Sequence, residues 1–498
     1  MKSCWPNIPM HMQVCARRCA LKSKMPSAKP SGRSSVSMPW PDDLKERITD
    51  DALYLPEGPF SGSVLSSLFD EIPSKQDGML LAVSGGPDSL ALVMLCYAWR
   101  SRLGHQIPIY LATVDHGLRE EAHAEAEYVG ELAQCLALPH AILNWQGDKS
   151  SSNLQGKARE ARYSLLVDHA QSLGVKTIVT AHHMDDQAET FLMRLLRGSS
   201  VRGLSAMRPA RVLNGLILAR PLLKHSKQEL QNILQRFDLN WCEDPSNESI
   251  RYLRVNVRKT LMPVLKRFGA DASHFSRTSE RLLRAEEALN SVTFEKFSAL
   301  MTPVVGRALV CNMIDYCLLA EEFRLRLLQE ALFQVAGPGY PCGEQSLISL
   351  DQDLVLWDDA ERRVRKKTLG ACCFAISGQR LWVYREPGRK PILAKLSVGE
   401  DFDWQGLWNV HYPDDRNIGA LTLSPLGERG RQKLLQTGLL KQESLVAMEA
   451  LPAGVIDALP SAWQENRLKF VMDLPEIAKA TGCPLEFSEK NTRFTKNG

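Results

Sequence analysis

Residues 79–89 of the 498-residue chain read Met-Leu-Leu-Ala-Val-Ser-Gly-Gly-Pro-Asp-Ser. An apolar run at 79–83 stops just before the glycine pair, and a second apolar run at 90–99 follows. This order predicts a buried strand, a glycine-rich turn and the start of a helix, where unpaired backbone N–H groups favour a phosphate. Gly85 and Gly86 allow backbone angles and a close approach that a Cβ would obstruct.

The polar residues of this turn also suit a phosphate. Ser84 and Ser89 add hydroxyl donors. Asp88 would repel a phosphate directly, so we expect it to hold Mg²⁺ or to orient the loop. The turn lacks the lysine of a Walker A loop and resembles the Ser-Gly-Gly-X-Asp-Ser motif of PP-loop enzymes, the N-type ATP pyrophosphatases that cleave ATP between the α- and β-phosphates. The candidate ATP-binding residues of the turn are Ser84, Gly85, Gly86, Pro87, Asp88 and Ser89. The alternative is a serine- and glycine-rich turn between two buried elements.

Length and composition set limits on the rest of the chain. A chain of 498 residues is long enough for two to four domains, and 44% hydrophobic residues are enough to build their cores. The twelve cysteines include no Cys-X-X-Cys pair, so we expect a reducing compartment, the cytoplasm. Residues 78–99 are apolar, but Gly-Gly-Pro-Asp at their centre argues against a membrane span, and no membrane partner is expected.

The N-terminal residues differ in composition from the rest. Residues 1–41 contain seven Lys or Arg and no Asp or Glu, with many serines and prolines. This composition is typical of a disordered tail, of translation assigned from too early a start, or of an organellar transit peptide, which would replace the cytoplasmic expectation. We treat residues 1–55 as a basic, disordered extension.

From residue 60 onward, strand-like and helix-like stretches alternate. The predicted strands after the first lie at 109–114, 140–145 and 176–181, and the predicted helices between them at 120–136 and 153–173. Such alternation predicts an α/β fold with a doubly wound parallel sheet, in which ligands bind outside the carboxyl ends of the strands. Ser84, Asp115 and His182 each follow a predicted strand, so we expect their loops to converge.

The remainder of the chain suggests two further domains. A helical pattern runs through roughly 275–335, and short β-like segments separated by Gly and Pro follow. We therefore divide the chain after the extension into an α/β domain at 56–268, a helical domain at 269–370 and a small α+β domain at 371–498.

A second polar block, His182-His183-Met184-Asp185-Asp186-Gln187-Ala188-Glu189-Thr190, follows the fourth predicted strand. On a helix beginning near Met184, Asp186 and Glu189 lie on one face. The alternatives are a solvated helix start, where acidic residues meet the helix dipole, or a metal site, for which adjacent histidines have poor geometry.

These motifs occur in one order with several others. The others are Val114-Asp115-His116-Gly117-Leu118-Arg119, Ala158-Arg159-Glu160-Ala161-Arg162-Tyr163, Gly203-Leu204-Ser205-Ala206-Met207, Arg220-Pro221-Leu222-Leu223, Glu243-Asp244-Pro245-Ser246-Asn247 and Arg254-Val255-Asn256-Val257-Arg258. Together they resemble the tRNA(Ile)-lysidine synthetase family, densely over about residues 79–260 and loosely beyond.

The resemblance implies a reaction in two steps. ATP adenylates the C2 oxygen of the wobble cytidine in a tRNA(Ile) with a CAU anticodon, and the side-chain amine of free lysine then displaces AMP to give lysidine. The implied cofactors are ATP and Mg²⁺. The residues 84–89 would hold the departing pyrophosphate, with Asp88 at the metal.

The resemblance also implies roles for five other residues. Asp186 and Glu189 would bind the lysine ammonium and accept its proton. Asp115 and His116 would lie at the nucleotide or the adenylation centre, although an Asp-His pair after a strand is often only a cap. Arg159 would add a cation at the phosphates, unless it serves only an ion pair on its own helix.

Two basic stretches suit an RNA partner. Residues 251–284 carry nine Lys or Arg against two acidic residues, and 362–367 form a basic run. Such stretches are often only solvated surfaces. Another PP-loop enzyme, such as a tRNA thiolase or a synthetase making an amide or GMP, and a non-catalytic RNA-binding protein remain alternatives. A homodimer is left open.

Overall fold

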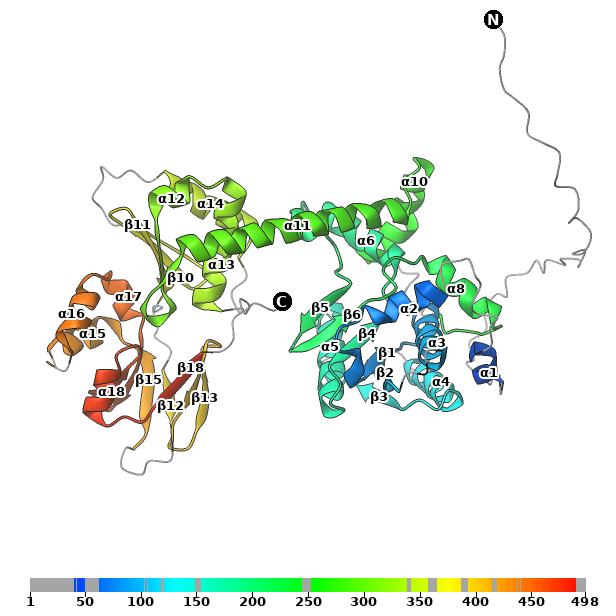
Figure 1. Ribbon diagram of the computed structural model, residues 1–498, viewed down its shortest axis with the longest axis horizontal. Helices are drawn as coiled ribbons and strands as arrows, with labels where there is room; N and C mark the ends of the chain where they lie inside the picture. The colour runs from blue at the N-terminus through cyan, green and yellow to red at the C-terminus, as the bar shows by residue number, and fades with distance from the viewer. Residues whose placement is uncertain are drawn as a thin grey trace, which may run out of the picture. The chain divides into compact units, whose positions relative to one another are not determined.

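The computed structural model describes residues 40–41, 43–49, 62–102, 104, 106–117, 121–147, 154–243, 252–337, 342–356, 365–386, 393–413, 419–436, 438 and 440–489 (Figure 1). The chain divides into two compact units with the boundary between Leu283 and Arg284. This boundary lies within the long helix α11 (Ala272–Leu300). We call residues 1–283 the first unit and residues 284–498 the second unit.

The first unit contains a six-stranded sheet in the order β3-β2-β1-β4-β6-β5. Its strands are β1 (Met79–Ala82), β2 (Ile109–Asp115), β3 (His140–Asn144), β4 (Thr177–Thr180), β5 (Ala210–Leu213) and β6 (Leu216–Ala219). The pairings among β3, β2, β1, β4 and β6 are parallel, and the four predicted strands are present. The predicted α/β fold with a doubly wound sheet is therefore confirmed for this unit.

The edge of this sheet differs from the prediction. Strand β5 pairs antiparallel with β6. The two are joined by Asn214 and Gly215, both at positive φ, and Asn-Gly is the strongest short sequence signal for a tight hairpin. The hairpin was therefore readable in the sequence, but its four-residue strands are too short to stand out by periodicity.

Ten helices precede α11 in the described part of the first unit, and some of them cover the two faces of the sheet. They are α1 (Leu44–Thr49), α2 (Gly62–Asp70), α3 (Pro87–Arg102), α4 (Glu121–Cys135), α5 (Leu154–Ser172), α6 (Met184–Leu195), α7 (Val201–Leu204), α8 (Lys227–Arg236), α9 (Leu253–Asn256) and α10 (Met262–Arg267). Helix α8 opens with a capping box of Ser226 and Glu229, each side chain accepting from the other's backbone N–H.

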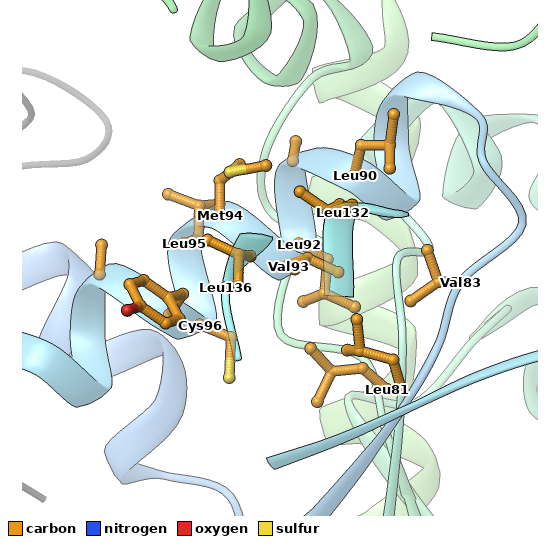
Figure 2. Close-up of a cluster of buried hydrophobic side chains, with 14 of the residues drawn as sticks. Leu81, Val83, Leu90, Leu92, Val93, Met94, Leu95, Cys96, Leu132 and Leu136 are labelled. Atoms are coloured by element: carbon orange, nitrogen blue, oxygen red, sulfur yellow. The ribbon is translucent and has the colours of Figure 1, made fainter. Parts of the chain in front are cut away.

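The alternation of side chains along β1 divides the core of the first unit in two. Leu81 and Val83 belong to a cluster with residues of α3, α4 and α8 (Figure 2). Leu80 and Ala82 belong to a second cluster with residues of α5. Since successive strand residues point to opposite faces, a strand buried on both faces must be apolar throughout, as β1 is.

The prediction of a disordered extension at residues 1–55 is wrong for residues 40–41 and 43–49, and 42 and 50–55 lie outside the described residues. The indole Nε1 of Trp40 donates a hydrogen bond to the carbonyl oxygen of Tyr128 at 3.1 Å, and the two rings stack. Leu44 and Ile48, one helical turn apart on α1, are fully buried in the core. The apolar spacing of residues 40–48 is therefore a better guide to their structure than the tail-like composition of the residues before them. Residues 1–39 lie outside the described residues.

The second unit is built from antiparallel sheets and short helices. The strands of its three sheets are, first, β7 (Thr302–Pro303), β8 (Leu309–Asn312), β11 (Arg380–Arg385), β10 (Cys372–Ser377) and β9 (Arg365–Leu369); second, β12 (Ala394–Leu396), β15 (Leu421–Pro425), β16 (Pro460–Gln464) and β17 (Arg467–Val471); third, β13 (Asp401–Trp404), β14 (Trp408–His411) and β18 (Glu486–Glu489). Its helices after α11 are α12 (Met313–Cys317), α13 (Glu321–Ala336), α14 (Glu344–Val355), α15 (Gly427–Gln436), α16 (Gln442–Glu449), α17 (Ala453–Asp457) and α18 (Pro475–Thr481).

The predicted sequence of a helical region followed by an α+β region is confirmed in outline. The helical pattern at 275–335 is interrupted by β7 and β8, which are too short to give a period of their own. The first sheet of this unit joins strands from both sides of residue 370, and the domain boundaries at 268 and 370 stay predictions. Within the described ranges, no helix is long and apolar enough to cross a bilayer.

The core beneath the phosphate loop gives a stability prediction. Leu92 on α3 is fully buried, so Leu92→Ala should lower the free energy of unfolding of the first unit by about 2–5 kcal/mol. Leu196, 62% exposed, is the matched control, and Leu196→Ala should change it by less than about 0.5 kcal/mol. Denaturant unfolding followed by fluorescence measures both, and equal effects would contradict this account of the core.

Candidate active site

The glycine-rich turn after β1 is held in shape by its own serines. The backbone N–H of Ser84 donates to Oγ of Ser89 at 3.1 Å, and that hydroxyl donates to the carbonyl oxygen of Gly86 at 2.9 Å. Gly85 has φ of +77°, and a Cβ there would lie 3.3 Å from Sγ of Cys242. The turn therefore requires glycine both for its backbone angle and for its packing.

Cys242, which has no predicted role, contacts the turn through its backbone. Its backbone N–H donates to the carbonyl oxygen of Gly85 at 3.0 Å. A backbone contact of this kind leaves no pattern in the sequence, so only the structure reveals it.

Asp88, on the first turn of α3, meets the second polar block through His183. Nε2 of His183 lies 3.4 Å from Oδ2 of Asp88 and 3.4 Å from Oδ2 of Asp186. His183 is 2% exposed, and it also caps α6. The other oxygen of Asp88, Oδ1, is buried and has no hydrogen-bond partner in the described part of the chain. One carboxylate oxygen of Asp88 thus binds the histidine and the other is available to a ligand.

The two adjacent histidines have opposite electrostatic environments. Burial lowers the pKa of His182 to about 3, with help from the positive charges of Arg220 and Arg162 and against the pull of Asp186. Burial also opposes charge on His183, but hydrogen bonds to Asp185 and Asp88 and the charge of Asp186 raise its pKa to about 10.

The protonation of the two rings fits their contacts. The Nδ1 atom of His182 pairs with the hydroxyl of Thr180 at 2.8 Å, which suits a neutral ring. The Nδ1 atom of His183 lies 3.4 Å from the N–H of Asp186 and 3.5 Å from Oδ2 of Asp185. Nδ1 accepts from the N–H only when it carries no proton. Donation from Nδ1 to Asp185 and from Nε2 to Asp88 or Asp186 needs a proton on both nitrogens, and the three carboxylates favour this charged form.

Asp186 and Glu189 lie on one face of α6, as expected, and two arginines bind them. Nε of Arg254 is 2.7 Å from Oε2 of Glu189, and its Nη2 is 3.2 Å from Oδ1 of Asp186. Nε of Arg258 is 2.5 Å from Oε1 of Glu189. Burial opposes ionisation of Asp186, but His183 and Arg254 lower its pKa overall. Arg254 and Arg258, which the sequence grouped with a basic RNA-binding stretch, therefore face this site.

Asp115 is the last residue of β2 and His116 follows it, at the same edge of the sheet. Oδ1 of Asp115 accepts the N–H of Gly117 at 2.7 Å, which is the local turn considered as the alternative role. The ring of His116 makes an edge-on contact with the ring of Trp145. Burial lowers the pKa of His116, the charge of Arg162 lowers it further, and the charge of Asp115 opposes both effects. Its buried Nδ1 has no hydrogen-bond partner among the described residues. Since β2, β1 and β4 are adjacent and parallel, the three predicted loops do converge.

Arg159 is exposed near the start of α5, and its guanidinium stacks on a tyrosine rather than forming an ion pair within the helix. Its Cζ lies 5.3 Å from the centre of the Tyr163 ring. Arg211 and Arg220 lie around the same ring. Sequence analysis quoted Arg220 within a motif but gave it no role, and it did not mention Arg211.

The chain matches known proteins over most of its length. Residues 62–265 match the PP-loop domain family. A tRNA(Ile)-lysidine synthase of Rhodopseudomonas palustris is 41% identical over 63% of this chain and 91% of its own length. The enzyme of the same name from Ruegeria pomeroyi is 35% identical over 86% of this chain and 95% of its own length. The chain belongs to the tRNA(Ile)-lysidine synthase family.

Structural similarity is weaker than this relationship in sequence. The U34-tRNA thiolase NcsA of Methanococcus maripaludis, solved with its [4Fe-4S] cluster, aligns with a TM-score of 0.39 and 16% identity over 45% of this chain and 78% of that chain. For a member of the tRNA(Ile)-lysidine synthase family, ATP use follows from the PP-loop domain. The polar residues at the carboxyl edge of the first sheet are therefore the candidate active site.

The packing of Gly85 gives a first prediction for this site. Gly85→Ala places a Cβ at positive φ against Cys242, and the strain of about 1–2 kcal/mol should weaken ATP binding by roughly tenfold. Isothermal titration calorimetry with ATP measures this change. Gly104→Ala is the control, because Gly104 also has positive φ but nothing lies within 4 Å of its Cβ position. Equal ATP affinity of the two variants would contradict the proposed role of the loop.

The low pKa of His182 gives a pH prediction. Its pKa falls from 6.5 to about 3 on folding, so between these values the unfolded chain binds a proton that the folded protein does not. The free energy of unfolding is therefore independent of this group above pH 6.5, and it decreases as the pH falls from 6.5 toward 3. We expect His182→Asn to flatten the loss of thermal stability between pH 6.5 and 4, and parallel curves for the variant and the wild type would contradict the burial of a neutral ring.

Proposed function

We propose that the carboxyl edge of the first sheet performs both steps of lysidine formation. The chain is a tRNA(Ile)-lysidine synthase, an ATP-dependent carbon–nitrogen ligase, by its family. In this reaction the C2 oxygen of the wobble cytidine becomes a phosphoester to AMP, and the amine of lysine then displaces AMP. The contact of His183 with both Asp88 and Asp186 carries the proposal, because it joins the phosphate loop to the carboxylate assigned to the amine.

The residues Ser84 to Ser89 bind the β- and γ-phosphates in this proposal. The first N–H groups of a helix have no partner within it, and no side chain on Gly85 or Gly86, just before α3, limits the approach of a phosphate. The pyrophosphate that leaves carries the negative charge that develops during adenylation. Donors that are fixed before the reaction stabilise this charge without reorganisation.

The free oxygen of Asp88 suits Mg²⁺. A buried carboxylate oxygen with no partner costs free energy unless it binds a cation or a donor. The described residues offer no group of three or more His, Cys, Asp or Glu side chains that could hold a metal by themselves. Mg²⁺ in nucleotide sites is held by one or two carboxylates together with phosphates and water, where it neutralises phosphate charge. Asp88 fits that arrangement.

Asp186 binds the lysine ammonium. His183 and Arg254 hold its carboxylate ionised, and a carboxylate with a lowered pKa binds an ammonium group strongly but accepts its proton weakly. We therefore assign to Asp186 the binding and orientation of the amine. Both oxygens of Glu189 are bound by Arg254 and Arg258, so Glu189 reaches the amine only if a guanidinium group leaves it.

His116 acts at the adenylation centre. Its ring is neutral at pH 7 because its pKa is lowered, and its unpartnered Nδ1 is available to the cytidine or the nucleotide. Asp115 supports the turn that carries His116 through its bond to Gly117. Arg159 adds positive charge for a phosphate group of the substrates.

The partners proposed for the chain are a CAU-anticodon tRNA(Ile) and free lysine, in the cytoplasm. The exposed cations of the stretch at 251–284 support RNA binding, whereas Arg254 and Arg258 serve the active site. In the second basic run, Lys366 stacks on Tyr384 and Lys367 pairs with Asp353, and residues 357–364 lie outside the described part. Homodimer formation stays an open prediction.

The role of Asp186 is tested by incorporation of radiolabelled lysine into unmodified CAU-anticodon tRNA(Ile). Asp186→Asn keeps the size of the side chain but removes the charge that binds the ammonium. We expect lysine transfer to be lost, by more than about a hundredfold, while ATP still binds and AMP is still transferred to the tRNA.

The control is Asp168→Asn, an exposed residue on α5, which should leave labelling unchanged. Unchanged lysine transfer in Asp186→Asn would refute the assignment of the amine. Absence of ATP-dependent labelling with the wild-type protein would refute the proposed activity itself.

A further inference from the structure

Three guanidinium groups surround the side chain of Tyr163. Cζ of Arg159 lies 5.3 Å and Cζ of Arg211 lies 5.8 Å from the centre of its ring. The side chain of Tyr163 also acts on Arg220, whose pKa it raises against the lowering effect of burial. We call Arg159, Arg211, Arg220 and Tyr163 the arginine cluster.

The arginine cluster lies at the same edge of the sheet as the active site. Arg220 directly follows β6, whose carboxyl end is adjacent to that of β4. Arg211 is near the start of the antiparallel strand β5, where Ala210 pairs with Ala219. The charge of Arg220 also acts on His182, which follows β4. Elements distant in sequence thus bring like charges together beside the reaction centre.

The positive charge of the arginine cluster has no counter-charge in the described part of the chain. None of its three arginines forms an ion pair with a described carboxylate. Arg220 is 4% exposed, its Nη1 donates to the carbonyl oxygen of Arg208 at 2.8 Å, and its buried Nε has no hydrogen-bond partner there.

This arrangement is unfavourable for the protein alone. Burial lowers the pKa of Arg220, and the charges of Arg211 and Arg159 lower it further against the opposing effect of Tyr163. Like charges held together cost stability unless an anion binds between them. Guanidinium groups suit phosphate oxygens, to which they donate two parallel hydrogen bonds.

We propose that the arginine cluster is a second phosphate site, and that it binds a phosphodiester of the RNA chain close to the modified nucleotide. The inference rests on the proposed function. The phosphate loop lies after β1, two strands away from β6 in the sheet, and already provides donors for the phosphates of ATP. Arg159 and Arg211 are exposed, as contact with a macromolecule requires, while the buried Arg220 fixes the site from below.

The test uses Arg211→Ala, because Arg211 is exposed and its loss leaves the core intact. We expect the dissociation constant for unmodified CAU-anticodon tRNA(Ile) to rise roughly tenfold near 0.1 M salt, since a charged hydrogen bond to phosphate is lost. The slope of log affinity against log salt should become shallower by about one unit. Arg211→Lys should keep the slope.

The matched control is Arg236→Ala, which removes an exposed arginine from the last turn of α8 in the same unit. It should change neither the RNA affinity nor the slope by a comparable amount. Equal salt slopes for the Arg211→Ala and Arg236→Ala proteins would overturn the proposal.

Binding of a non-hydrolysable ATP analogue distinguishes the two sources of phosphate. The proposal expects Arg211→Ala to leave this affinity unchanged. Weaker binding of the analogue with unchanged RNA affinity would assign the cluster to ATP and overturn the proposal. Labelling of tRNA with lysine by the wild-type protein is scored separately, so a failure of the proposed activity and a failure of the RNA phosphate site give different results.

Discussion

The burial of strand β1 on both faces and its pairing on both edges is the constraint on which the rest of the first unit depends. Leu81 and Leu80 point to opposite layers of helices, and β2 and β4 flank the strand. No part of β1 can shift without opening one of the two cores. The turn that follows it therefore begins at a fixed point, and the geometry of the candidate active site depends on this hydrophobic packing.

Electrostatic balance differs sharply between the two sides of that edge. Around α6, the carboxylates of Asp186 and Glu189 are matched by Arg254, Arg258 and the charged His183. Around Tyr163, positive charge accumulates without a described partner. A site that must bring together two polyanions and a cationic amine needs both kinds of environment close together, and separate elements of one sheet supply them.

The sequence predicted what depends on local order and on the usual topology of alternating strands and helices, and it failed on individual contacts between distant side chains. The strand, turn and helix around Ser84 follow from a continuous run of residues, and the face shared by Asp186 and Glu189 follows from helical spacing. No such regularity links Arg254 to Glu189, 65 residues apart, or Arg211 to Tyr163. The packing of Trp40 was hidden because the composition of the residues before it dominated the interpretation.

The contact between Cys242 and Gly85 has a consequence for how the protein is made. The carbonyl oxygen of Gly85 accepts from the backbone N–H of residue 242, which is synthesised more than 150 residues after it. A contact so remote in the chain forms late, because the loop between its ends must close first. During synthesis on the ribosome, the turn after β1 therefore gains this contact only once nearly the whole first unit has emerged.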